Sequence, residues 1–134
     1  MQQPFSWDSP TTLPGRRWLQ ALPFLLAAAL AQAQPQPPMA WTTVGQQGLV
    51  RFVIVPEAQA RDRAAYAQQV ALLCEPERTC FLNFYTNSTG AAVALPLPDA
   101  IDREATAVYR RSAKQGAKRF QWSCRLQVSQ EPCF

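Results

Sequence analysis

The chain has 134 residues, a formal net charge of +4 and no histidine. This length suits one small domain, and the basic excess is too small to indicate nucleic acid as a partner. Histidine is the usual base for a serine or cysteine nucleophile. Its absence therefore argues against that class of enzyme, and we predict no catalytic residues.

The first 33 residues have the pattern of an export signal. Arg16 and Arg17 precede the short apolar run 18–30, and residues 31–33 supply the small-x-small sequence that a signal peptidase requires. We therefore expect cleavage after Ala33 and an exported product, either periplasmic or secreted. The exported part keeps eleven basic and eight acidic residues, which leaves a net charge of about +3.

Other interpretations of this N-terminal region remain open. A membrane span needs about 20 apolar residues, and Gln20 and Pro23 interrupt a shorter run here. If the signal stayed uncleaved, it would tether the protein to the membrane. A lipid anchor would need a cysteine where Gln34 stands. The arginine pair also leaves twin-arginine export as an alternative to the general route, although its flanking residues match that motif poorly.

Four cysteines lie in the exported part: Cys74, Cys80, Cys124 and Cys133. An even number in a small exported domain predicts two disulfides, for which three pairings exist. We expect the local pairs, because Cys74–Cys80 would close a tight loop and Cys124–Cys133 would pin the tail to the last strand. Without histidine or a Cys-x-x-Cys motif, we expect no metal, no cofactor and no thioredoxin-like activity.

The first half of the exported part reads as a spacer, two strands and a helix. Residues 34–40 form a proline-rich, extended spacer, and residues 41–134 are expected to form a single globular domain. Residues 41–47 are a possible short strand. Residues 49–55 form a strand in which only Arg51 is polar. The helix over 59–74 has this apolar stripe: Tyr66, Ala67, Val70, Leu73 and Cys74. Gln68 and Gln69 lie on its polar side.

The second half reads as a strand, a helix and a last strand. Residues 80–86 alternate and contain aromatic side chains, which indicates a strand, and residues 87–90 form a turn. Asp99 is the expected N-cap of a helix over 99–114 that Gly116 ends. Its expected apolar stripe is Ile101, Ala105, Val108 and Tyr109. Residues 120–128 alternate as a half-buried strand.

These elements predict a β-α-β-α-β order. We expect a small, disulfide-stapled two-layer sandwich of the α/β or α+β class, with a three- to four-stranded sheet and both helices mainly on one face. A small-ligand site would lie beyond the carboxyl ends of parallel strands. The candidate residues for that edge are Glu57, Thr86, Asn87, Ser88 and Thr89. Ordinary turn chemistry also explains the last of these.

A second candidate is a basic cluster near the expected end of the second helix. Its members are Arg110, Arg111, Lys114, Lys118 and Arg119. Such a cluster could meet an anionic partner, although a solvated helix end has the same composition. A third candidate is the pair Asn83 and Tyr85, which suits either a protein-binding surface or an internal hydrogen bond.

The sequence favours an exported binding or interaction protein. Its partner would be an unidentified protein or an anionic envelope polymer, rather than nucleic acid, and contact with a membrane would require the uncleaved signal. A small hydrolase-like or ligand-binding enzyme at the strand edge is one alternative. A membrane-tethered envelope accessory protein is another. The sequence leaves the oligomeric state open.

Overall fold

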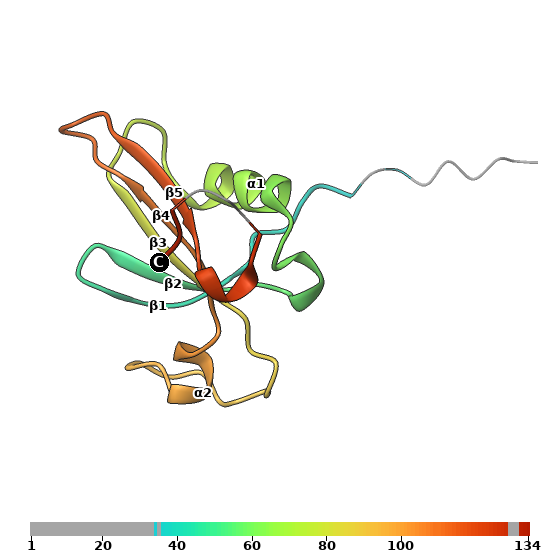
Figure 1. Cartoon of the computed structure of the whole chain (residues 1–134). Coiled ribbons are helices and arrows are strands. Elements are labelled where there is room, and N and C mark those ends of the chain that lie inside the picture. The colour runs from blue at the N-terminus through green and yellow to red at the C-terminus, as the bar shows by residue number, and fades with distance from the viewer. Residues whose placement is uncertain (1–33, 35, 129–131) are drawn as a thin grey trace, which may run out of the picture. The chain divides into compact units, whose positions relative to one another are not determined.

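Five strands form one mixed sheet in the computed structural model, which describes residues 34, 36–128 and 132–134 (Figure 1). The strands are β1 (Thr42–Gln47), β2 (Val50–Ile54), β3 (Cys80–Tyr85), β4 (Ala105–Arg111) and β5 (Lys118–Trp122). They lie in the order β1-β2-β3-β4-β5; β2 and β3 are parallel, and every other pair is antiparallel. The expected export signal lies outside the described residues.

The crossover between the two parallel strands contains the main helix. It consists of a short 3-10 turn, η1 (Glu57–Gln59), followed by α1 (Arg63–Leu73). The predicted helix over 59–74 therefore begins four residues late. Asp62 accounts for this start, because its carboxylate accepts the amides of Ala64 and Ala65 at 3.0 and 3.2 Å.

The main core lies between α1 and one face of the sheet. Tyr66 of α1 is fully buried at its centre. Four rings surround it edge-on at centroid distances of 4.9–5.6 Å: Trp41, Phe84, Phe120 and Trp122. Its hydroxyl donates to the carbonyl of Ala60 at 3.0 Å and accepts from the hydroxyl of Thr106 at 2.8 Å. One side chain thus ties the helix to four strands or their flanks.

The pKa of Tyr66 is raised to about 12, because the effect of burial exceeds the opposite effects of the hydrogen bond with Thr106 and the charge of Arg125. The unfolded chain releases this proton near pH 10, so folding is favoured below that pH and loses the contribution as pH rises to about 12. We expect the free energy of unfolding to fall by up to about 2 kcal/mol across this window. Urea unfolding at pH 9–12 measures it, and Tyr66→Phe should flatten the decline.

The expected second helix is wrong beyond its first turn. Only α2 (Asp99–Asp102) is helical, and β4 follows directly. Pro98, rather than Asp99, is its N-cap. The β-branched and aromatic residues Thr106, Val108 and Tyr109 favour a strand, and pairing with β3 supplies their hydrogen bonds. Gly116, with a φ of +63°, belongs to the β4–β5 turn and ends no helix.

The two helices do not share a face of the sheet. Ile101 of α2 packs with Phe52 and Tyr85, which point away from α1. Residues 91–97 complete this second, smaller core. The molecule is therefore α+β, with five strands instead of three or four, and α2 lies on the other side of the sheet from α1 (Figure 1).

Both predicted disulfides are confirmed. Cys74–Cys80 joins the end of α1 to the start of β3, with 5.8 Å between the Cα atoms. Cys124–Cys133 holds the tail beside β5, with 5.0 Å between the Cα atoms. The expected strand over 120–128 ends earlier, at Trp122, and a 3-10 turn, η2 (Cys124–Leu126), follows. Two disulfides are consistent with an oxidising, extracytoplasmic environment.

Gln69 departs from its expected place on the polar side of α1, since it is only 4% exposed. Its carbonyl oxygen accepts the amide of Trp41 at 2.6 Å, and its amide donates to the carbonyl of Met39 at 2.9 Å. The polar side chain is buried because it pairs with the backbone that leads into β1.

Replacing Gln69 by leucine should lower the free energy of unfolding by about 1–3 kcal/mol, because the buried amide of Trp41 loses its partner and the carbonyl of Met39 loses a hydrogen bond. Gln68→Leu is the matched control, since Gln68 is exposed on the same helix and should change stability by less than about 0.5 kcal/mol. Urea titrations followed by tryptophan fluorescence compare the two. Equal losses in both variants would contradict this role of Gln69.

Candidate functional site

The expected ligand edge is assembled where β2 and β3 end. Ile54 pairs with Tyr85 in the parallel register, so the residues that follow both strands emerge at the same edge. Glu57 follows β2, and residues 86–89 follow β3. Thr86 is buried and its amide donates to the carbonyl of Glu104 at 3.1 Å. The predicted residues therefore do follow the carboxyl ends of two neighbouring parallel strands.

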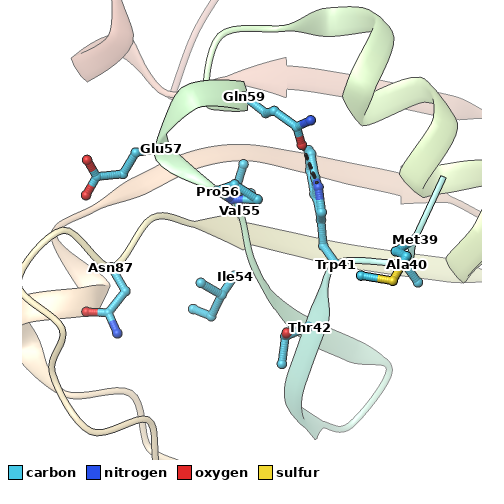
Figure 2. A pocket seen from close by; sticks show the side chains of 10 residues that line it. All are labelled: Met39, Ala40, Trp41, Thr42, Ile54, Val55, Pro56, Glu57, Gln59 and Asn87. Atoms are coloured by element: carbon cyan, nitrogen blue, oxygen red, sulfur yellow. Dashed lines mark hydrogen bonds between the residues drawn. The ribbon is translucent and has the colours of Figure 1, made fainter. Parts of the chain in front are cut away.

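A cavity of about 580 Å³ opens at this edge between the lead-in to β1 and η1 (Figure 2). Its floor includes Trp41, whose indole N–H donates to Gln59 at 2.9 Å. Glu57 lies across the cavity from Trp41, on the side of Asn87. The Asn87 side chain is occupied, since its amide donates to the carbonyl of Ala91 at 2.9 Å and its oxygen accepts the Ala91 amide at 3.0 Å. Asn87 therefore forms the turn rather than offering free groups.

A second cavity of about 320 Å³ lies on the other side of Glu57. Glu104 lines it, and its carboxylate accepts hydrogen bonds from both the amide and the hydroxyl of Ser88. Desolvation raises the pKa of Glu104, but these hydrogen bonds outweigh it and hold the pKa below its usual value. Arg125 donates to the carbonyl of Glu104 at 3.1 Å. Thr89 lines neither cavity.

Glu104 and Arg125 were missed as members of this edge. Glu104 reads in the sequence as a helix-start carboxylate, and Arg125 reads as one polar position of an alternating strand. Both expectations depended on secondary structure that the molecule does not have. Only the pairing of β3 with β4 brings residue 104 next to residue 86, and no short-range pattern shows that contact.

The basic cluster lies on the β4–β5 hairpin instead of at a helix end. The register places Arg110 opposite Arg119 and Arg111 opposite Lys118. Successive residues of a strand point to opposite faces, so each face of the hairpin carries one like-charged pair. Lys114 lies in the turn between the strands. The five residues are therefore gathered as expected, but by a hairpin.

Two members of the basic cluster, Arg110 and Arg111, form hydrogen bonds with the rest of the fold. Arg110 donates to the carbonyls of Leu82 and Tyr109, both at 2.9 Å, and to the side-chain oxygen of Asn83 at 2.6 Å. Its guanidinium also lies 5.6 Å from the ring centroid of Phe81. Desolvation lowers the pKa of Arg110, although arginine remains charged in proteins.

Arg111 is the second member that the fold holds, whereas the other three members are exposed. Arg111 donates to the carbonyls of Arg78 and Glu75 and so fixes the loop that Cys74–Cys80 closes. Lys114, Lys118 and Arg119 are exposed. Over the part of the chain that the structure describes, their side chains form no ion pair. These three are therefore the members of the cluster that are open to a partner.

Asn83 and Tyr85 form an internal contact. The amide of Asn83 donates to the Tyr85 hydroxyl at 3.3 Å, and Tyr85 is only 7% exposed. Burial raises the pKa of Tyr85, more than the hydrogen bond from Asn83 lowers it. The structure therefore favours the internal hydrogen bond over an exposed aromatic binding surface.

No helix in residues 34, 36–128 and 132–134 combines the length and apolar character that a membrane span requires. No protein family, curated protein or solved structure matches this chain.

Proposed function

We propose that the protein is an exported, periplasmic or secreted binding module that holds an anionic envelope polymer on its β4–β5 hairpin. The observation that carries the proposal is the cross-strand register, which places one like-charged pair on each face of the hairpin. Like charges directly opposite each other destabilise a sheet. A bound polyanion would remove that repulsion and gain several attractive contacts at once.

The arrangement of Arg110 supports a ligand that carries carboxylate or phosphate groups. Its three hydrogen bonds to the fold use three of the five donors of the guanidinium. Two donors remain, and Arg119 is the cross-strand register partner of Arg110. A guanidinium that the fold already orients loses less entropy when it binds a carboxylate or phosphate. The half-buried arginine thus supplies geometry, and the exposed cations supply attraction.

Three anionic probes with one neutral control test this function. Polyglutamate and polyphosphate present the two ligand chemistries, vesicles of phosphatidylglycerol present a lipid surface, and vesicles of phosphatidylcholine are the control. We expect micromolar binding to a soluble polymer, with an affinity that falls steeply with salt. Binding to phosphatidylglycerol alone would transfer the role to a membrane surface. No binding to any anion at low salt would refute the proposal.

The mass of the protein purified from cells tests the export part of the proposal. A product that begins at Gln34 is expected for a cleaved signal. A product that begins at Met1 would instead favour the membrane-tethered accessory protein. Alkylation without reduction should leave the mass unchanged, because all four cysteines are paired.

A small-ligand site at the strand edge is the second candidate. The supporting observation is that Glu57 borders both cavities and carries a carboxylate with no ion-pair partner among the described residues. Such a site would suit a small cationic or amine ligand near Trp41. Titration with a panel of small amines, followed by the NMR signal of the Trp41 indole N–H, tests it. Shifts that persist in Glu57→Gln would contradict a role for this carboxylate.

A further inference from the structure

We infer that the Cys74–Cys80 disulfide is a redox site, at which an external dithiol reduces the bond and Arg51 holds the resulting thiolate of Cys80. Arg51 is the one polar residue of β2, the strand that precedes the crossover and pairs with β3. It is half-buried, and one nitrogen of its guanidinium, Nη2, donates to both the carbonyl of Leu73 at 2.7 Å and the sulfur of Cys80 at 3.1 Å. This inference does not depend on the proposed polyanion binding.

The contact with sulfur changes in strength with the redox state. A disulfide sulfur is a weak hydrogen-bond acceptor, whereas a thiolate carries a full negative charge. A guanidinium at this distance lowers the pKa of a cysteine thiol and so stabilises the reduced form. A structural role alone, as a cap on the last turn of α1, would use only the contact with Leu73. The contact with Cys80 is the part that a cap does not require.

A small reductant can approach the bond from one side. Although Cys74 and Cys80 are 5% and 3% exposed, an open cavity of about 240 Å³ lies beside Cys80. Arg51, Thr79 and Cys80 are among its lining residues. The cavity therefore borders both the cation of Arg51 and Cys80, whereas a fully enclosed structural disulfide has no such opening beside it.

The exchange balances as a two-electron reduction. A thiolate of the dithiol enters the cavity and attacks the sulfur of Cys80, the bond between the two protein sulfurs breaks, and Cys74 leaves as a thiolate that takes a proton. The second thiol of the reductant then attacks the reductant's own sulfur in the mixed disulfide and releases Cys80 as a thiolate beside Arg51. The dithiol is oxidised to a cyclic disulfide, and one further proton passes to solvent.

Several other charged groups lie near the Cys74–Cys80 disulfide and contribute to the electrostatic potential there. Arg111 of β4 lies opposite Cys80 in the register and donates to the loop carbonyls. Arg78 and Glu75 pair with each other at 3.3 Å on the loop surface, and Glu77 lies between them. Among the described residues, only Arg51 places a charged group in contact with a sulfur of this disulfide.

The test equilibrates the folded protein in mixtures of reduced and oxidised dithiothreitol. Quenching, alkylation and peptide mass spectrometry then give the midpoint of each disulfide separately. Replacing Arg51 by methionine should raise the reductant ratio needed to half-reduce Cys74–Cys80 by about tenfold, or about 30 mV for two electrons. The midpoint of Cys124–Cys133 should move less than twofold.

Two further variants separate the redox effect from a loss of structure. Arg51→Lys keeps a cation and should recover part of the shift, while Arg78→Gln changes a cavity arginine that lacks a sulfur contact and should leave the midpoint unchanged. Should Arg51→Met fail to fold, Arg51→Lys against Arg78→Gln gives the comparison, and an intermediate shift in the lysine variant alone is expected. Midpoints within twofold of wild type in every Arg51 variant would overturn the inference.

The pH profile gives a readout that a structural cap would not change. The advantage of Arg51 exists only while Cys80 is a thiolate in the reduced protein. The difference between wild type and Arg51→Met should therefore shrink as pH falls below the lowered thiol pKa and grow as pH rises toward 8.5, the usual cysteine value. A difference that is constant between pH 5 and 8.5 would also overturn the inference.

Discussion

Replacing Tyr66 by alanine should lower the free energy of unfolding by about 3–5 kcal/mol. A domain of this size has a total stability of about 5–15 kcal/mol, so this loss is a large fraction of the total. Tyr66 is fully buried and contacts rings from both ends of the sheet, including Trp41 and Trp122. Its removal leaves a cavity that these rigid rings cannot fill by small shifts.

Thermal and urea unfolding of two companion variants show which part of Tyr66 matters. Tyr66→Phe keeps the ring and should lose only about 1–3 kcal/mol, since Ala60 and Thr106 lose one hydrogen-bond partner. Leu72→Ala removes an exposed side chain of the same helix and should cost less than about 0.5 kcal/mol. A Tyr66→Ala protein that is as stable as Leu72→Ala would contradict the central place of Tyr66 in the core.

Reversing the charge of Arg119 should weaken polyanion binding by about tenfold and at the same time stabilise the fold by about 0.5–1 kcal/mol. The two effects have opposite signs because Arg119→Glu converts a repulsive cross-strand pair with Arg110 into an attractive one. A residue retained for stability alone would not show this opposition. Isothermal titration with polyphosphate and urea unfolding measure the two quantities on the same preparation.

Arg103→Glu is the control for the change of net charge. Arg103 lies on the surface after α2, where it forms an exposed ion pair with Asp99 at 3.8 Å. Its reversal should change polyanion binding less than twofold and stability by less than about 1 kcal/mol. If Arg103→Glu weakens binding as much as Arg119→Glu does, the attraction belongs to the whole charge of the protein and not to the hairpin.

The segment 99–114 shows why only part of the fold could be predicted from sequence. Ile101, Ala105, Val108 and Tyr109 recur at helical spacing, but Ala105, Ala107 and Tyr109 also satisfy the alternation of a strand. A short segment that fits both periods is decided by its tertiary partner. Here residues 105–111 pair with β3, and the local sequence does not show that β3 is available for pairing.

The candidate sites were predictable to the extent that they depend on local chain order. The two disulfides close loops of few residues, and the basic cluster is contiguous enough that either a helix end or a hairpin would gather it. The strand edge followed from one correct inference, that β2 and β3 are parallel. Glu104 and Gln69 could not be placed, since their partners are far away in sequence.

The first strand of the sheet gives the molecule protection against aggregation. An exposed edge strand offers unpaired backbone groups to other chains, and long, flat, apolar edges are the dangerous ones. β1 is short, its exposed positions are threonine and glutamine, and its register with β2 shifts between Thr43 and Gly45. That irregularity bends the edge and makes it a poor template for a further strand. Such an edge keeps neighbouring copies of the protein from adding to the sheet.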